Sequence, residues 1–230
     1  MRAPVQVALF AVACLAAVAT GSDRALSEMQ APSWGSSFER VQAPAGPNHP
    51  ALPWFQPLID RASAGSVLRP PPGGYSGPVV LSKPLTIEGG GAVVIDGGGK
   101  GTVLVVQADG AVVRGLRLRG SGGSHNTDDA CINVRGHRNR IEDNELADCL
   151  FGVDLKQANE NVVKGNRIRS KAFDLGLRGD ALRLWYSMNN LIEGNEVVDS
   201  RDMVVWYSNG NRFLNNSGRR GRYSLHFMFS

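Results

Sequence analysis

The sequence has few aromatic residues, little net charge, and no stretch between its apolar runs long enough for a crossover helix. Aromatic residues make up 7% of the 230 residues whereas glycine occurs 28 times, which suits short strands and tight turns better than long packed helices. The formal net charge of +4 is too small to indicate a nucleic-acid partner. Because parallel strands in a βαβ fold need crossover helices, the short gaps exclude that architecture. The hydrophobic share of 42% still allows one sizeable domain with a buried core.

The first 19 residues have the pattern of a secretory signal sequence. Arg2 supplies the positive start, residues 5–18 are almost all apolar, and Ala17-Val18-Ala19 is a small-x-small cleavage site. Pro4 and the short apolar run argue against a membrane span. We therefore expect residues 1–19 to be a signal peptide, and the protein to be periplasmic with no transmembrane segment.

The rest of the chain divides at residue 53. Residues 20–52 are rich in proline, serine, alanine and glycine without periodicity, which predicts a flexible leader. Residues 53–230 contain the patterned sequence. At their start, apolar residues between Phe55 and Ala62 have helical spacing and predict a short helix that caps the first coil of a repetitive domain.

Asparagine recurs at two fixed positions of a repeat of roughly 22 residues. Each series has the spacings 22, 29 and 21, and a loop insertion around residues 170–178 explains the long one. Such a repeat predicts an all-β fold, a right-handed, single-stranded parallel β-helix (a solenoid) with an N-terminal capping helix. We expect both series to form structural ladders at the turns, because asparagine tolerates left-handed backbone angles and its amide can bond along a stack. The series are Asn139, Asn161, Asn190, Asn211 and Asn144, Asn166, Asn195, Asn216.

The repeat also predicts which side chains face the bore. Alternation along a strand directs the pairs Ile132/Val134, Val153/Leu155, Leu182/Leu184 and Leu225/Phe227 inward. The residues between them are then directed outward: Asn133, Asp154, Arg183 and His226. Residues 223–230 begin another coil and stop in mid-turn, so we expect the solenoid to be incomplete at its C-terminal end.

The same register places Cys131 beside Gly152, three residues after Cys149. Along an extended strand that separation is about 10 Å, beyond the reach of a disulfide. Export would permit a disulfide, but the spacing favours two small core or turn residues.

An acidic stretch, His125 to Ile132, offers one possible catalytic site. Adjacent Asp128 and Asp129 resemble part of the polygalacturonase motif, in which paired carboxylates act as acid and base on a β-helix. The Gly-His-Gly of that family is absent, since Phe151-Gly152-Val153 stands there. We favour a polar loop with no catalytic residue, and keep as the alternative a carbohydrate-active hydrolase or a carbohydrate-binding module.

Three near-repeated triplets predict a column of aromatic and thioether side chains on successive coils. Trp185-Tyr186-Ser187, Trp206-Tyr207-Ser208 and Met228-Phe229-Ser230 are separated by 21 and 22 residues. If Leu182 and Leu184 face inward, then Trp185, Trp206, Met228 and Arg183 face outward. This column is either a partner surface or a locally packed patch, and we give the two equal weight.

His226 and Met228 lie two residues apart on one predicted strand and therefore on one face. Imidazole and thioether together suit copper, especially Cu(I), and Met203 could add a second thioether. We take these three residues as a candidate copper site.

These last segments resemble the NosD family, the periplasmic β-helix proteins of nitrous oxide reductase maturation. The early coils resemble more generally the carbohydrate-binding and sugar hydrolase (CASH) and pectin-lyase-like β-helices. The NosD resemblance implies an accessory protein without enzymatic activity that helps to deliver copper to nitrous oxide reductase. It also implies the partners: the ATPase and membrane subunits of an ABC transporter, a copper chaperone, and the reductase. The strand segments that carry it are Gly179–Ser187, Arg201–Ser208 and Leu225–Ser230, the last with the family's His-x-Met.

Overall fold

The computed structural model describes residues 44–230, so the predicted signal peptide and most of the predicted leader lie outside the described residues. Every pairing between the named strands is parallel. Across residues 44–230 no helix has both the length and the apolar character needed to span a bilayer. The predicted all-β class is confirmed.

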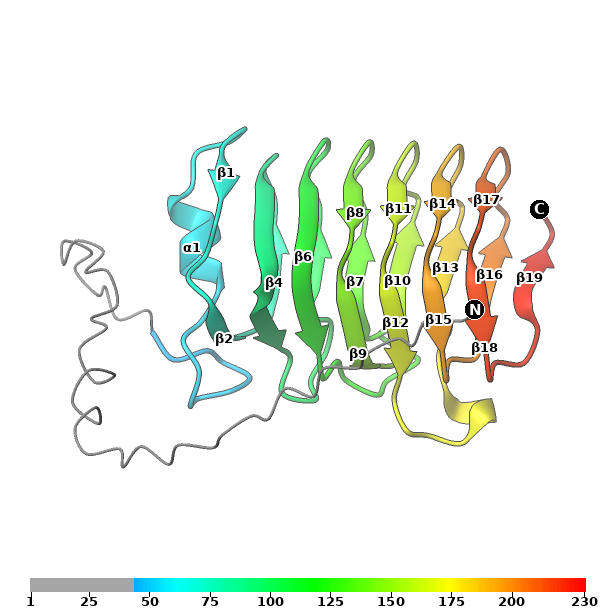
Figure 1. The fold of residues 1–230 in the computed structure, drawn as a ribbon, viewed down its shortest axis with the longest axis horizontal. Helices are drawn as coiled ribbons and strands as arrows, with labels where there is room; N and C mark the ends of the chain where they lie inside the picture. The colour runs from blue at the N-terminus through cyan, green and yellow to red at the C-terminus, as the bar shows by residue number, and fades with distance from the viewer. Residues whose placement is uncertain (1–43) are drawn as a thin grey trace, which may run out of the picture. The chain divides into compact units, whose positions relative to one another are not determined.

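The strands stack in three columns, and the chain passes through each column once per coil (Figure 1). This is a parallel β-helix, as the asparagine repeat predicts. The first two columns share one 12-stranded sheet, here called the two-column sheet, because β4 and β6 run through both. The third column is a separate seven-stranded sheet with one strand from each of seven coils.

The first column contains β1 (Val67–Leu68), the first parts of β4 (Thr86–Asp96) and β6 (Val112–Arg119), β8 (Arg140–Glu142), β11 (Val162–Lys164), β14 (Leu191–Glu193) and β17 (Arg212–Leu214). The second column contains β2 (Gly73–Ser76), the last parts of β4 and β6, β9 (Glu145–Cys149), β12 (Arg167–Ser170), β15 (Glu196–Val198) and β18 (Ser217–Arg219). The seven-stranded sheet contains β3 (Val79–Leu81), β5 (Leu104–Val106), β7 (Ala130–Val134), β10 (Phe151–Lys156), β13 (Leu182–Trp185), β16 (Asp202–Trp206) and β19 (Ser224–Met228).

A short helix, α1 (Gln56–Arg61), lies beside the first coil (Figure 1). Phe55 and Ile59 are fully buried and join the core of the solenoid, so the predicted capping helix is present. Residues 44–52 also contact the first coils: the backbone of His49 donates to Ser76 Oγ, and Asn48 donates to the carbonyl of Lys100. The folded region therefore begins before residue 53, within the predicted leader.

The bore is filled by aliphatic side chains in stacked rows. The inward pairs predicted for β7, β10 and β13 are all fully buried. Met203 aligns with Leu182 and Leu225 and lies in the same core. On β19, Leu225 is partly buried and Phe227 is 57% exposed, because no coil among the described residues covers that side of β19.

Both asparagine series form hydrogen-bonded ladders along the stack. In the second series the backbone N–H of Asn144 donates to Oδ1 of Asn166, and that of Asn166 to Oδ1 of Asn195, at 3.0 and 2.9 Å. Each Nδ2 donates back to a carbonyl of an earlier coil, as Asn166 does to Ile141 at 2.8 Å. In the first series the backbone N–H of Asn139 likewise donates to Oδ1 of Asn161, and Nδ2 of Asn190 and of Asn211 donates back to a carbonyl of an earlier coil. The side chains thus satisfy backbone groups that turns leave buried and unpaired.

The expectation of unpaired cysteines is wrong. Cys131 on β7 and Cys149 at the end of β9 form a disulfide, with their Cα atoms 5.5 Å apart. The sequence argument measured the separation along an extended strand. The chain instead turns sharply around Asp148, whose φ is +53°, and again before β10. Cys149 therefore faces Cys131 across a corner of the bore.

Candidate functional site

The outer face of the seven-stranded sheet carries the residues that the sequence singled out. One row across the coils is Asn133, Asp154, Arg183, Val204 and His226. A second row, two residues further along each strand, is Trp185, Trp206 and Met228. The predicted register is therefore correct, and the two rows lie side by side on β13, β16 and β19.

Arg183 is directed outward as predicted, but it is not a surface residue. Its side chain is 12% exposed and forms two hydrogen bonds to the fully buried carboxylate of Asp154, at 2.8 and 2.9 Å. A second ion pair joins it to Asp128 at 2.8 Å, and the guanidinium lies 4.1 Å from the centre of the Phe151 ring. Burial by itself would lower the pKa of Arg183, but the bonds to Asp154 and Asp128 raise it above the usual value. Arg183 thus holds the fold and is unavailable to a partner.

The two aspartates of the acidic stretch serve different structural purposes. Burial alone would raise the pKa of Asp128, but hydrogen bonds and charges from Arg183 and Lys156 outweigh it, so that this pKa is lowered. Asp129 accepts hydrogen bonds from the backbone of Ser124 and the hydroxyl of Thr127, at 2.9 and 2.7 Å. An ionised carboxylate held by two cations is a poor proton donor. Both carboxylates are thus engaged in contacts within the fold.

An exposed aromatic stack runs beside the second row, and the sequence argument missed it. Tyr186, Tyr207 and Phe229 stack with ring centres 5.0 and 5.2 Å apart and with planes 15° and 10° from parallel. They are 43%, 38% and 76% exposed, whereas their neighbours Trp185 and Trp206 are half-buried. The triplets that predicted the column of Trp185, Trp206 and Met228 contained the signal, since the middle residue of each is aromatic.

The backbone of the stack is unusual for such bulky residues. Tyr186, Tyr207 and Phe229 have φ values of +47°, +48° and +53°, in the left-handed region that favours glycine or asparagine. In the preceding coil Gln157 occupies the corresponding turn position, with φ +53°. The turn therefore does not require an aromatic residue. Bulky residues held in such a strained backbone conformation are typical of functional surfaces.

The structure brings together two of the three predicted copper ligands. His226 and Met228 lie on the outer face of β19, and both are half-buried. Nδ1 of His226 is buried without a hydrogen-bond partner, and the Tyr223 ring packs on the imidazole edge to face at 5.3 Å. Met203 does not join them, because the alternation of β16 directs it into the core. Among residues 44–230 no three histidine, cysteine, aspartate or glutamate side chains form a metal cluster.

A buried charged corner adjoins this face at the start of β13 and β16. Burial raises the pKa of Asp180 to about 6, although Arg201 and Arg183 oppose the shift. Oδ1 of Asp180 and Nε of Arg201 are both buried without a partner. Asp202 is fully buried and accepts from Nη2 of Arg222 at 2.6 Å, which fixes the entry to β19.

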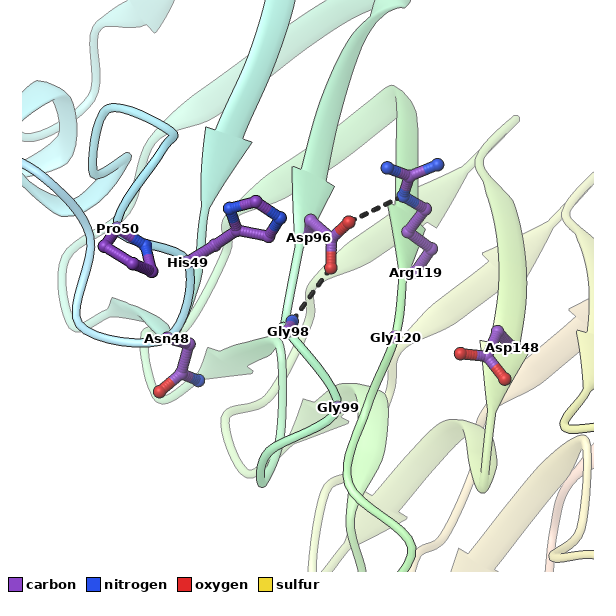
Figure 2. A pocket seen from close by; sticks show the side chains of 9 residues that line it. All are labelled: Asn48, His49, Pro50, Asp96, Gly98, Gly99, Arg119, Gly120 and Asp148. Atoms are coloured by element: carbon purple, nitrogen blue, oxygen red, sulfur yellow. Dashed lines mark hydrogen bonds and ion pairs between the residues drawn. The ribbon is translucent and has the colours of Figure 1, made fainter.

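A hollow of about 610 Å³ lies elsewhere, where residues 48–50 face the glycine turns of two coils (Figure 2). Its principal charged groups already pair with each other: Asp96 accepts from Nε of Arg119 and from the backbone of Gly98, both at 2.8 Å. Asp148 stands apart on the far wall (Figure 2). None of the residues predicted from the sequence lines it, and we assign it no function.

The outer face of the two-column sheet is an ion-pair ladder. Opposite charges alternate from coil to coil, as in Glu88, Arg114 and Glu142, or in Arg117, Glu145, Arg167 and Glu196. Ion pairs join neighbours, such as Arg117 and Glu145 at 3.1 Å. This face is charged, exposed and internally neutralised, which is typical of a solvated surface. The candidate site is therefore the outer face of the seven-stranded sheet at coils five to seven.

Two comparisons with known proteins found similarity to this chain, and one of them covers these coils. A family model described as "Periplasmic copper-binding protein (NosD)" matches residues 165–230, which contain every strand from β12 to β19. The chain is also 32% identical over 138 residues to a curated protein of Pseudomonas aeruginosa, "Probable ABC transporter binding protein NosD". That match covers 56% of this chain and 31% of the relative, so the chain spans about a third of the relative's length. The predicted resemblance to NosD is confirmed.

Proposed function

We infer that this protein is a periplasmic accessory protein that handles copper on the outer face of its seven-stranded sheet and works with an ABC transporter. The single observation that carries this is the match of a periplasmic copper-binding family to residues 165–230. Those residues build the coils on which His226 and Met228 lie. The name of the Pseudomonas relative supports the association with a transporter.

The donor chemistry of β19 fits copper. Nδ1 of the His226 imidazole is buried and has no hydrogen-bond partner among residues 44–230, and a metal ion would provide one. Met228 places a thioether on the same face two residues away. Imidazole and thioether suit copper rather than calcium or magnesium, which take oxygen ligands.

The aromatic stack and the second row are the proposed partner surface, and the membrane subunit of the transporter is the proposed occupant. Tyr186, Tyr207 and Phe229 form the exposed part, with Trp185, Trp206 and Met228 beside them. Aromatic residues and methionine are enriched in protein interfaces. We propose further that copper passes from a chaperone through this face to nitrous oxide reductase, the role that the family resemblance implies.

Two features support a place outside the cytoplasm. Residues 1–19 carry the predicted signal sequence. The disulfide between Cys131 and Cys149 would form and persist in an oxidising compartment such as the periplasm.

The copper proposal is tested by titrating the exported protein with Cu(I) against a competing chelator. We expect one bound Cu(I), and at least a tenfold weaker affinity for His226→Ala with Met228→Ala, since two donors are lost. Met203→Leu is the matched control, because Met203 is a thioether in the core, and it should keep the parent affinity. Equal affinity of the double variant and the parent would show that copper, if bound, is held elsewhere.

The partner proposal is tested by co-expressing the protein with the transporter's membrane and ATPase subunits and measuring co-purification. Tyr186→Ser with Tyr207→Ser should bind the transporter at least tenfold more weakly, since aromatic contacts dominate interfaces. Arg117→Ser with Arg167→Ser alters the solvated face and should bind as the parent does. Loss of binding in the arginine variant alone would place the interface on the two-column sheet.

A further inference from the structure

His226 and Met228 are two donors, and a tightly held Cu(I) ion needs more contacts than these. The register decides what lies next to them. On the neighbouring strand β16, Val204 is paired with His226 and Trp206 is paired with Met228. Strands in a sheet lie about 4.8 Å apart, so these are the nearest side chains on that side of the face. Valine offers no ligand, and only the indole of Trp206 remains.

Trp206 is held rigidly in its place. Its ring packs against Tyr207 with centres 6.0 Å apart and planes 20° from parallel, and Tyr207 is itself stacked between Tyr186 and Phe229. The side chain is half-buried, although it belongs to a row on the outer side of the sheet. A ring fixed in this way keeps its position when an ion binds beside it.

Packing alone does not explain the choice of tryptophan. Nε1 of Trp206 is buried and has no hydrogen-bond acceptor in the described part of the chain, whereas the indole N–H of Trp54 donates to the carbonyl of Pro78 at 2.8 Å. An unmet buried donor costs about 1–3 kcal/mol, which an apolar residue of similar size would avoid. What tryptophan offers in return is the most electron-rich ring face among the side chains, and such a face attracts cations.

We propose that Trp206 completes a Cu(I) site with His226 and Met228, its indole ring acting as a π contact for the ion. This inference rests on the proposed copper function. The three groups are one imidazole, one thioether and one aromatic face, a soft and uncharged set. Such a set favours Cu(I) over Cu(II) and Zn(II), which prefer harder or charged donors. The ring also shields the ion from water and from oxidation.

Tryptophan fluorescence during an anaerobic Cu(I) titration reports on this contact directly. We expect Cu(I) to quench the parent protein, because the ion lies against an indole. Trp206→Leu should lose that quenching and bind Cu(I) about tenfold more weakly, in line with a desolvated cation–π contact. Trp206→Phe keeps a ring face but has no indole, so it should lose the quenching and bind Cu(I) with an affinity between those of the parent and the leucine variant. If the leucine variant does not fold, the phenylalanine variant carries the test.

Trp185→Leu is the matched control, because Trp185 occupies the same row one coil earlier, paired with Trp206 but not with β19. It should keep the quenching and the affinity of the parent. If Trp206→Leu binds Cu(I) as tightly as the parent while His226→Ala does not, the π contact is wrong and the copper function stands. If the parent binds no Cu(I), or binds it independently of His226 and Met228, both proposals fail.

Discussion

At the scale of single residues, Asp180 has the least favourable surroundings of the charged groups near the site. Its carboxyl is largely buried at the start of β13, and Oδ1 has no hydrogen-bond partner. Burial raises its pKa to about 6 against the opposing charges of Arg201 and Arg183. Between about pH 4 and pH 6, the carboxyl of Asp180 is protonated in the folded state but already largely ionised in the unfolded chain. It therefore removes stability as the pH rises from about 4 to about 6.

We expect Asp180→Asn to be more stable than the parent at pH 7, by on the order of 1–3 kcal/mol, and nearly equal to it at pH 4. At pH 4 the folded carboxyl is protonated and the unfolded one is only about half ionised, so most of the penalty is absent. Urea unfolding of both proteins at the two pH values measures the difference.

Asp199→Asn gives a control of opposite sign. The hydrogen bond from Arg220 lowers the pKa of Asp199, so its stabilising effect is present at neutral pH and is lost as the pH falls. A stability difference between Asp180→Asn and the parent that did not change with pH would contradict the account of Asp180.

The direction of a side chain could be predicted from the sequence at this scale, but its burial could not. The alternation along β13 correctly directs Arg183 outward. Its exposure depends on Asp128, which reaches it from the loop before β7, two coils earlier in the chain. A repeat register contains no information about such a loop. For the same reason the register could pair Trp185 with Trp206 but did not reveal that the more exposed rings were Tyr186 and Tyr207.

At the scale of elements, the asparagine ladders fix one coil upon the next. Asn166 lies in the middle of its ladder and is fully buried. It accepts from the backbone of Asn144 and donates to the carbonyl of Ile141, at 3.0 and 2.8 Å. Neither group has water to replace the amide. The ladder thus supplies hydrogen-bond partners to buried main-chain groups, and its interruption leaves buried polar atoms without partners on two coils.

Asn166→Ala should lower the free energy of unfolding by about 2–4 kcal/mol, since at least two buried backbone groups lose their partner. Asn209→Ala, which alters an exposed turn residue of the same type, should change it by less than about 0.5 kcal/mol. Chemical unfolding of both variants measures the contrast. Similar small losses in both would mean that the ladder is a consequence of coil stacking and does not stabilise it.

The elements themselves were largely predictable, because the repeat is local and regular. The coils, the capping helix and both asparagine series follow from spacings in the sequence. The corners did not follow, because a corner depends on single left-handed residues. Asp148 is one of these: it has a φ of +53° inside β9, where the pairing with β12 is shifted, and Cys149 next to it meets Cys131. A distance estimated for an extended strand fails at such a place.

At the scale of the whole molecule, two faces of the solenoid have different chemistry. On the two-column sheet, opposite charges alternate and neutralise one another from coil to coil. On the seven-stranded sheet, the buried ion pair of β10 and β13 lies beside the aromatic and soft groups of β13, β16 and β19. The proposed copper site and partner surface lie on the second of these faces. The disulfide joins the two sheets at the coil where β9 leads into β10, just before the coils that carry the candidate site begin.

Because the disulfide links the two sheets, its removal measures how much this link contributes to the stability of the solenoid. Cys131→Ala with Cys149→Ala should lose about 3 kcal/mol of stability, because the bond closes a loop of 18 residues that the unfolded chain would otherwise sample freely. Denatured protein from the periplasm should show neither cysteine as a free thiol. Recovery of both as free thiols, together with an unchanged unfolding midpoint in the double variant, would mean that the pair is only packed in the bore. If the loss is seen, the two sheets depend on a covalent link, and correct folding of this chain depends on export to an oxidising compartment.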